Sequence, residues 1–307
     1  MEPADGLADL VTTEYAKVRL SDVTLASATQ GQLEQVLHEQ QQRDLLESHG
    51  LAPLRRLLLT GPLGTGKSMT ASALATELSV PLVTIRIDAL TSKYTGETSS
   101  KLRVVFDAMA HPPTVYLFDD FFDEFGAIGA WPMAGSDVVD ARRILTMFLS
   151  FLGNYQPESL IVAVTDHRSL LDDALLRRFD TDIPYTLPDS TQALDLLRRR
   201  LDAVDTSAVS WEEVGNHVKG LSQAGLVRAA ESTAKRAILS GSDSVSTCTL
   251  ITSLSELRRI HHVTGFSIGD FTRLARILRI CALIYTPCSV NSKMILIDEL
   301  RSWECGC

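Results

Sequence analysis

One short segment of the chain carries residue types that suit the binding of phosphate groups. It reads Gly61-Pro62-Leu63-Gly64-Thr65-Gly66-Lys67-Ser68 and lies between an apolar run and a stretch with helical periodicity. Glycines let backbone N–H groups approach phosphate oxygens, the lysine reaches the β- and γ-phosphates, and the serine hydroxyl can bind Mg²⁺. The start of the following helix adds positive potential there. The pattern therefore predicts a P-loop, in which these residues and the next one, Met69, bind the phosphates of ATP.

A phosphate site of this kind also needs a carboxylate for the metal ion. Asp119 directly follows the apolar run 115–118, which predicts that it stands at the end of a neighbouring strand. From such a position a carboxylate holds Mg²⁺ through water. We therefore expect Ser68 and Asp119 to form the metal side of a site whose cofactors are ATP and Mg²⁺.

The order of apolar runs predicts the elements that position these residues. Strand-like runs occur at 56–60, 81–87, 114–118 and 160–165, and helix-like stretches at 67–78, 98–110 and 137–152. Such alternation predicts an α/β fold in which a parallel sheet is sandwiched by helices. Ligands of such sheets bind at the carboxyl ends of the strands, where both candidate segments fall.

The flanking segments predict further parts of the chain. An apolar pattern at 31–49, ended by Gly50 and Pro53, indicates a lead-in helix. After Pro188 the strand signals stop, and amphipathic stretches at 189–203, 211–217, 223–240 and 249–262 predict a small all-α domain. We expect an N-terminal segment over 1–50, a nucleotide-binding domain over 51–187, a helical lid over 188–262 and a tail without clear pattern over 263–307.

Composition limits the kinds of partner. The 307 residues carry a formal net charge of −9, which argues against an extensive nucleic-acid surface, because phosphate binding needs clustered Lys and Arg. The chain has neither a basic start followed by an apolar core nor an apolar stretch of membrane-spanning length. Its 5 cysteines, an odd number, fit reduced thiols. We therefore expect a cytoplasmic protein that binds neither membrane nor nucleic acid.

Three segments together resemble those of the AAA+ ATPases. They are the P-loop, the strand that ends at Asp119, and Leu175-Leu176-Arg177-Arg178-Phe179-Asp180. The likeness is densest from about residue 20 to about residue 259 and is nearest to bacterial single-module members of the classical clade. This resemblance implies a homo-oligomeric ring, usually a hexamer, that hydrolyses ATP and pulls on polypeptide clients. Because the sequence contains no protease motif such as HExxH or GxSxG, a separate protease is a further candidate partner of such a ring.

The resemblance assigns roles to residues outside the P-loop. Arg177 and Arg178 resemble the arginine fingers that one subunit inserts into its neighbour's site. Tyr94 resembles the pore-loop aromatic that grips an extended chain. Ala224 resembles the lid residue beside the base and ribose, although Gly225 stands where the family usually has Asp.

Two departures from the family pattern concern hydrolysis. The residue that polarises the attacking water is usually a Glu directly after the metal-side Asp. Here Asp120 has that position, while Glu124 has that identity about one helical turn further on, so both stay candidates. Asp166 stands where the family usually has the sensor 1 Asn that orients the water. An ionised Asp accepts hydrogen bonds where an amide would donate, and it adds negative charge beside the phosphates.

These features leave two principal hypotheses open. The P-loop, the arginine pair and the aromatic loop favour an ATP-driven ring that remodels or unfolds protein clients. The altered carboxylates and Gly225 favour a nucleotide-binding scaffold or switch with impaired hydrolysis. A third hypothesis, a clamp loader or DNA remodeller, conflicts with the acidic balance of the chain.

Overall fold

The computed structural model describes residues 6–90, 95–110, 113–119, 121–122, 136–154, 158–171, 173–242 and 244–264. By its internal contacts the chain divides into a first unit, Met1–Ser255, and a second unit, Glu256–Cys307. The described residues of the second unit, 256–264, are the last turns of helix α13 (Thr247–Thr264). The elements that follow belong to the first unit.

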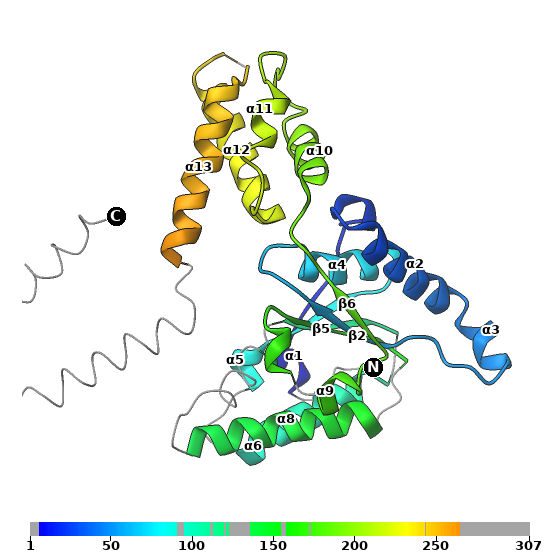
Figure 1. Cartoon of the computed structure of the whole chain (residues 1–307). Coiled ribbons are helices and arrows are strands. Elements are labelled where there is room, and N and C mark those ends of the chain that lie inside the picture. Colours follow the sequence, from blue (N-terminus) through cyan, green and yellow to red (C-terminus); the bar gives the residue numbers. More distant parts are fainter. Residues whose placement is uncertain are drawn as a thin grey trace, which may run out of the picture. The chain divides into compact units, whose positions relative to one another are not determined.

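A mostly parallel sheet forms the centre of the first unit (Figure 1). In the described part of the chain it has 6 strands in the order β1-β3-β4-β5-β2-β6. Strands β2 to β6 pair in parallel, whereas β1 pairs antiparallel with β3. The predicted parallel sheet is thus confirmed, with an antiparallel edge strand added to it. The strands are β1 (Val11–Glu14), β2 (Arg56–Thr60), β3 (Leu82–Ile85), β4 (Val115–Phe118), β5 (Leu160–Thr165) and β6 (Thr181–Pro184).

Helices cover both faces of this sheet. Figure 1 shows α2 and α4 on one face and α6, α8 and α9 on the other. Strand β2 explains how both faces become apolar, because alternate side chains of a strand point to opposite sides. Leu57 and Leu59 belong to the core under α2 and α4, and Leu58 to the core under α6 and α8. The helices are α2 (Ser27–Gln41), α3 (Arg43–Ser48), α4 (Lys67–Glu77), α6 (Thr95–Ala108) and α8 (Ser136–Asn154), with the short α1 (Leu7–Leu10), α5 (Ile87–Leu90) and α9 (Asp173–Leu176).

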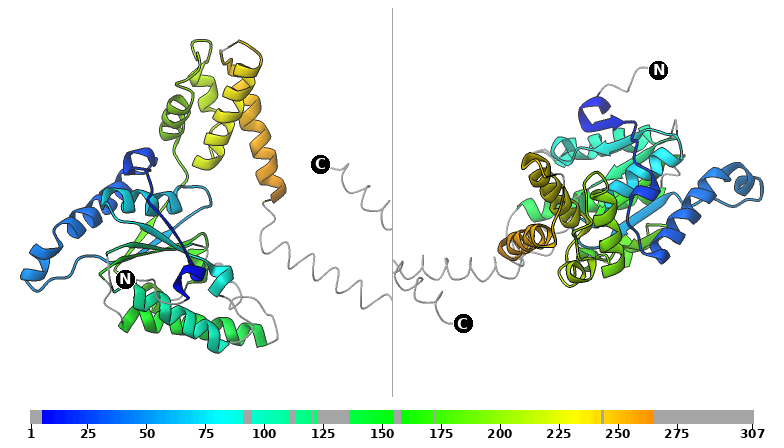
Figure 2. Two further views of the ribbon diagram at one scale, coloured as in Figure 1. Left: turned by 180° about the vertical axis from the view of Figure 1, so that it is seen from behind. Right: turned by 90° about the horizontal axis from the view of Figure 1, so that it is seen from above.

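The stretch predicted as one lead-in helix is two helices in the structure. Helix α2 ends at Gln41 and α3 begins at Arg43, and both follow one side of the sheet in blue in Figure 2. Gln42 between them has φ −103° and ψ 24°, outside the helical region. The Arg43 guanidinium donates to the Gln40 side chain at 2.6 Å and to the Glu158 carbonyl at 2.5 Å. These bonds hold the chain at the break, while Gly50, with φ 74°, follows the end of α3 as predicted.

Strands β1 and β6 were not predicted, and their side chains explain why. Three of the four residues of β1, Thr12 to Glu14, are exposed, so the strand lacks an apolar signal. In β6, Asp182 accepts hydrogen bonds from the Thr60 hydroxyl at 3.0 Å and from the Arg168 guanidinium at 2.7 Å. These two hydrogen bonds stabilise the Asp182 carboxylate within the strand. Because Asp is rare in strands, the sequence pattern does not indicate a strand here.

The described helical region after Pro188 begins with α10 (Ser190–Arg200) and continues with α11 (Trp211–Gly215) and α12 (Gln223–Leu239). A reciprocal capping box starts α10. The Gln192 N–H donates to the Asp189 carboxylate at 2.8 Å, and the Asp189 N–H donates to the Gln192 side chain at 3.1 Å. Ser222 accepts a hydrogen bond from the Gly225 N–H at the start of α12. These caps fix the positions at which the two longer helices begin.

Aromatic rings at the end of β4 fix the position of Asp119. The Phe148 ring of α8 lies 5.0 Å from the Phe118 ring and 4.4 Å from the Phe121 ring, measured between centroids. All three side chains are fully buried. Because Phe118 and Phe121 flank Asp119 in sequence, this packing holds the carboxylate at the strand end.

We predict that Phe148→Ala lowers the free energy of unfolding by about 3–5 kcal/mol, because the smaller side chain leaves a cavity between α8 and β4. Urea denaturation followed by circular dichroism measures the change. The matched control is Leu239→Ala, at an 87% exposed position, for which we expect a change within about 0.5 kcal/mol. A Phe148→Ala midpoint equal to that of the control would contradict the assignment of this ring to the core.

Candidate functional site

One cleft of about 500 Å³ collects the carboxyl ends of three parallel strands. Strand β2 leads into the P-loop, β4 into Asp119 and β5 into Asp166, and all three segments line the cleft. Adjacent parallel strands place their ends side by side, which is why the sheet brings together residues more than a hundred positions apart. The lining residues are Asp22, Leu63, Gly64, Gly66, Lys67, Ser68, Met69, Asp119, Val164, Asp166, Leu196, Arg200, Gln223, Ala224, Val227 and Arg228.

Gly64 is required by the close approach of helix α12. Its φ is 74°, and a Cβ atom there would lie 2.9 Å from the Ser222 hydroxyl and 3.0 Å from the Ala224 Cβ. The Gly64 carbonyl accepts a hydrogen bond from the Ala224 N–H at 3.0 Å. The predicted lid residue Ala224 is therefore bonded directly to the P-loop.

Parts of the P-loop stabilise the loop itself. The Thr65 side chain is fully buried, and its hydroxyl donates to the Pro62 carbonyl at 2.8 Å. Gly61, Pro62 and Leu63 line a neighbouring hollow together with Tyr185. Of the residues predicted to bind the phosphates, Gly61, Pro62 and Thr65 thus lie outside the lining of the main cleft, and their predicted contact with ATP stays a prediction.

Lys67 is held by three acceptors. Its ammonium donates to the Gly61 carbonyl at 2.7 Å, to the Pro62 carbonyl at 2.9 Å and to the Asp166 carboxylate at 2.5 Å. An ammonium has three N–H donors, so these contacts use all of them. The Lys67 side chain is only 4% exposed, whereas that of Asp166 is 22% exposed. A phosphate group would therefore have to replace at least one of these acceptors, and Asp166 is the one of the three that lines the cleft.

The residues at the cleft fit a phosphate chain and Mg²⁺. Helix α4 begins at Lys67 without a side-chain cap, so its first backbone N–H groups have no side-chain acceptor at the cleft. The Ser68 hydroxyl and the half-buried Asp119 carboxylate supply oxygen atoms, which Mg²⁺ prefers as ligands. These two residues would hold the ion, as predicted from the sequence.

The segment 20–25 joins the P-loop to the helical region. The Gln223 side-chain amide donates to the Thr24 carbonyl, and the Arg199 guanidinium donates to the Thr24 hydroxyl at 3.0 Å. Val23 packs against Gly66, where an added Cβ would lie 3.0 Å from the valine methyl. Asp22, which belongs to this segment, lines the cleft.

Several cleft residues were missed at the level of sequence. Arg200 follows Leu196 by four positions on α10, and Arg228 follows Ala224 by four positions on α12, so each pair shares one helix face. If one residue of such a pair is known to face the nucleotide, the four-residue spacing predicts that the other faces it too. Asp22 carries no comparable signal, because its place depends on contacts with distant residues.

A family model described as "ATPase family associated with various cellular activities (AAA)" matches residues 57–187. The chain carries an AAA domain. The matched range begins in β2 and ends just before α10, so it includes the P-loop, Asp119 and Asp166. The motifs and the matched range therefore identify the same domain.

Proteins with similar sequences carry AAA-type names. An "Uncharacterized AAA family ATPase y4kL" of Sinorhizobium fredii is 31% identical over 186 residues, which cover 61% of this chain and 55% of that protein. A proteasome-activating nucleotidase of Sulfurisphaera tokodaii is 29% identical, covering 70% of this chain and 56% of that protein. An ATP-dependent zinc metalloprotease FtsH of Acidothermus cellulolyticus is 29% identical, covering 75% and 36%. The chain thus matches about half or less of the length of these relatives.

The fold agrees with a solved AAA domain. A crystal structure of the FIGL-1 AAA domain superposes with a TM-score of 0.64 and covers 84% of this chain and 90% of that chain. Its sequence identity is 21%, so the likeness concerns the fold. The similarity extends beyond residues 57–187, because 84% of the chain is more than that range contains.

The predicted arginine fingers lie at the surface of the AAA domain, away from the cleft. Arg177 and Arg178 follow α9 and are exposed, and neither lines the cleft of its own chain. The Arg178 guanidinium lies against Gly153, where an added Cβ would collide with it. Asp180, two residues on, pairs with the Arg56 guanidinium at 2.8 Å and so fixes the segment to β2.

Three predicted residues of the AAA domain lie outside the described residues. They are Asp120, Glu124 and the pore-loop candidate Tyr94. Their predicted roles remain predictions. Within the described ranges, no group of three His, Cys, Asp or Glu residues could hold a metal ion, and no helix is both long and apolar enough to cross a membrane.

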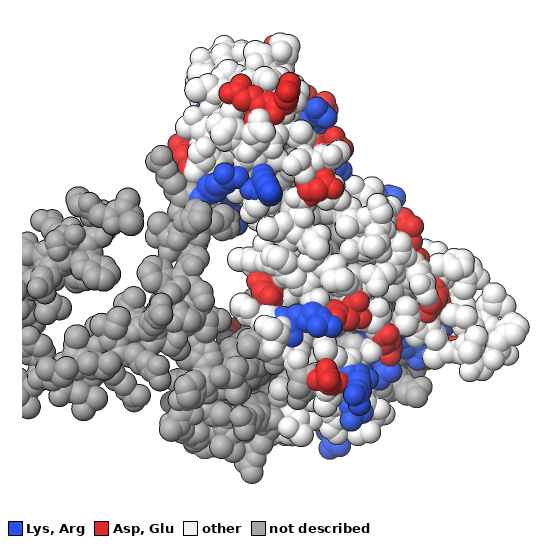
Figure 3. Space-filling view, in the orientation of Figure 1, with Lys and Arg blue, Asp and Glu red and all other residues white. Residues whose placement is uncertain are grey.

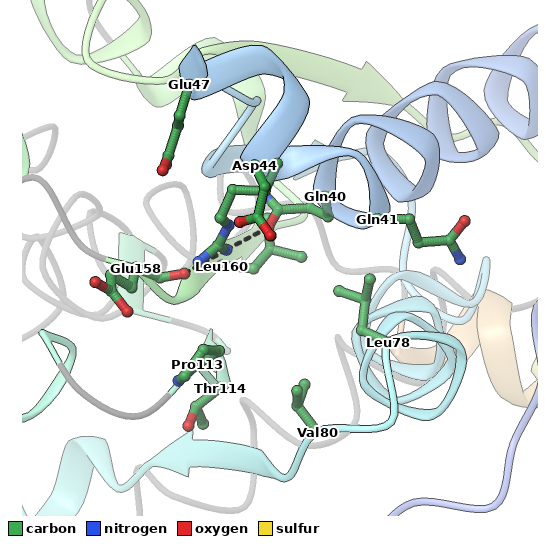
Figure 4. Close-up of a pocket in the computed structure, with 11 residues that line it drawn as sticks. Gln40, Gln41, Asp44, Glu47, Leu78, Val80, Pro113, Thr114, Glu158 and Leu160 are labelled. Atoms are coloured by element: carbon green, nitrogen blue, oxygen red, sulfur yellow. Dashed lines mark hydrogen bonds between the residues drawn. The ribbon is translucent and has the colours of Figure 1, made fainter. Parts of the chain in front are cut away.

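A second cavity, of about 440 Å³, lies at the opposite ends of the strands (Figure 4). Val80, Thr114 and Leu160 line it where β3, β4 and β5 begin. Its polar side chains are mainly amides and carboxylates, and the Arg43 guanidinium donates a hydrogen bond to the Gln40 side chain. Burial, and to a smaller extent the charge of Arg55, lowers the pKa of Arg43. The glycine-rich segment 61–66 is not among the residues that line this cavity.

We predict that Asp166→Asn tightens binding of Mg²⁺-ATP by about tenfold, the equivalent of about 1.4 kcal/mol, because a neutral amide competes less with phosphate for Lys67. Titration with a fluorescent ATP analogue measures the dissociation constant. The control is Asp182→Asn, which neutralises a carboxylate of the same sheet outside the cleft lining. Unchanged or weaker binding in Asp166→Asn, relative to that control, would contradict a competition between Asp166 and phosphate.

Proposed function

We propose that this protein binds ATP with Mg²⁺ in the cleft of its AAA domain and hydrolyses the bond between the β- and γ-phosphates. The observation that carries the proposal is the arrangement of the cleft, in which the P-loop, Asp119 and Asp166 stand at the ends of adjacent strands. The match of an AAA family model to residues 57–187 and the ATPase names of similar proteins support it.

The chemistry follows from the charges around the cleft. Lys67 and the start of α4 would stabilise negative charge on the phosphates, while Ser68 and Asp119 hold the metal side. When bound, Mg²⁺ neutralises charge on the phosphate oxygens. We propose Asp120 or Glu124 as the carboxylate that activates water, and Asp166 as the residue that orients it.

We further propose that the protein works as a homo-oligomeric ring, most simply a hexamer, that remodels or unfolds polypeptide clients. Arg177 and Arg178 support this, because exposed arginines that do not line their own cleft are available to a neighbouring subunit. Tyr94 would then contact the client. A relative named as a proteasome-activating nucleotidase supports a separate protease as a partner.

Charge and cysteine content support the remaining parts of the proposal. On the face in Figure 3, Lys and Arg side chains are interspersed with Asp and Glu rather than gathered into a basic stripe. With a net charge of −9, this supports a protein partner rather than nucleic acid. An odd number of cysteines, including the exposed free Cys248, supports a cytoplasmic location.

One observation favours the alternative of a nucleotide-binding switch with impaired hydrolysis. Asp166 pairs with Lys67 at 2.5 Å, and an ionised carboxylate beside the γ-phosphate would oppose the charge that develops during hydrolysis. Such a protein would bind ATP and change its state without sustained turnover. Steady-state turnover decides between the two candidates.

We predict that the ATPase activity per subunit rises with protein concentration, because the arginine finger comes from a neighbouring subunit. Lys67→Ala should lose ATP binding and turnover together. Arg178→Ala should keep binding but lose turnover by about a thousandfold or more, the effect of removing an arginine finger. A coupled-enzyme assay measures the rates.

Arg198→Ala is the matched control for Arg178→Ala. Arg198 is also exposed and makes a surface pair with Asp195 at 3.4 Å, so its loss should leave the rate unchanged. Equal rates in Arg178→Ala and this control would refute the finger. Tight ATP binding by the wild type without turnover at any concentration would refute the motor and support the switch.

A further inference from the structure

Tyr185 directly follows the last residue of β6, Pro184, and begins the connection to α10. Its side chain is 5% exposed and belongs to the core under α2 and α4. Its backbone N–H donates to the Thr60 carbonyl at 2.6 Å, directly before the P-loop. Tyr185 therefore lies beneath the loop without lining the main cleft.

The backbone of Tyr185 packs against the first residue of the P-loop. Gly61 has φ 138°, and a Cβ atom there would collide with the Tyr185 carbonyl and lie 3.0 Å from the Tyr185 Cβ. No other residue type fits at Gly61 without moving Tyr185 or the loop. The start of the P-loop is thus fixed by contact with Tyr185.

The hydroxyl of Tyr185 reaches the other end of the loop. It donates to the Thr70 hydroxyl at 2.7 Å, and the Thr70 hydroxyl in turn donates to the Gly66 carbonyl at 3.0 Å. Thr70 is fully buried, so this chain of hydrogen bonds runs through an interior that excludes water. Such bonds reinforce one another, and each is expensive to leave unmade in an apolar interior.

The phenol of Tyr185 stays a neutral donor. Burial raises its pKa, and the hydrogen bond with Thr70 opposes this only in part. Neither group has another role in the candidate chemistry. A phenylalanine at 185 and a valine at 70 would satisfy the apolar core, so the two hydroxyls require a separate explanation.

We propose that Tyr185 is a positioning residue of the nucleotide site, which holds Gly61 directly and Gly66 through Thr70. These two glycines are the first and last glycines of the P-loop. Both help to place Lys67, because the Gly61 carbonyl accepts a hydrogen bond from its ammonium at 2.7 Å and Gly66 directly precedes it in the chain. A small displacement of a group that contacts the reacting phosphate weakens binding and chemistry alike. The inference rests on the proposed binding of ATP.

The test compares hydroxyl deletions at both ends of the hydrogen bond. Tyr185→Phe and Thr70→Val should each raise the dissociation constant of a fluorescent ATP analogue with Mg²⁺ by roughly three- to tenfold, the loss expected for one buried hydrogen bond. The double variant should bind about as weakly as either single variant, because both remove the same interaction. Thr70→Ser keeps a hydroxyl and should bind like the wild type.

Tyr116→Phe is the matched control. It removes a hydroxyl from another buried tyrosine, 4% exposed, which donates to the Ala108 carbonyl at 3.2 Å instead of to the P-loop helix. We expect it to lower the urea midpoint to a similar extent and to leave ATP binding unchanged. This separates positioning of the loop from a general loss of stability.

Two outcomes would overturn the inference and are distinguishable from each other. Suppose that the wild type binds ATP. Equal dissociation constants for Tyr185→Phe and Tyr116→Phe would then refute the positioning role alone, and so would a double variant of Tyr185→Phe and Thr70→Val in which the two effects multiply. Absence of ATP binding by the wild type refutes the proposed function, and the positioning role falls with it. Should Tyr185→Phe not fold, the comparison of Thr70→Val with Thr70→Ser decides the question.

Discussion

The buried ammonium of Lys67 is the constraint on which the site depends. A charge whose side chain is 4% exposed is costly unless it is paired, and here two loop carbonyls and the Asp166 carboxylate surround it. The sheet provides this arrangement directly. Thr60 of β2 and Thr165 of β5 are register partners, so the next residues of the two strands, Gly61 and Asp166, emerge side by side. The pairing of the two apolar strands β2 and β5 therefore determines which polar residues meet at the cleft.

This arrangement links the stability of the protein to its proposed activity. In the structure the Asp166 carboxylate accepts a hydrogen bond from the Lys67 ammonium. A bound phosphate would compete with this carboxylate for the ammonium and would carry a like charge beside it. The motor and the switch proposals differ in whether ATP is turned over despite this competition.

The sequence predicts the parts of the fold that depend on local pattern. Strands β2 and β5 occupy the predicted bounds 56–60 and 160–165, because a strand buried on both faces is a continuous apolar run. The P-loop and Asp119 follow from short motifs at such strand ends. The edge strand β1 escapes prediction because its side chains are polar and exposed. The contacts of Gln223 with Thr24, and of Tyr185 with Thr70, join residues more than a hundred positions apart and leave no local signal.

A structure of the protein bound to a non-hydrolysable ATP analogue and Mg²⁺ tests the account most directly. The decisive measurement is the distance from the Lys67 ammonium to the Asp166 carboxylate, which is 2.5 Å in the structure described above. The account predicts that this pair separates and that the ammonium contacts the β- and γ-phosphates, with Ser68 and Asp119 on the side of the metal ion. An intact pair of Lys67 and Asp166, with the analogue bound elsewhere or without contact to Lys67, would contradict it.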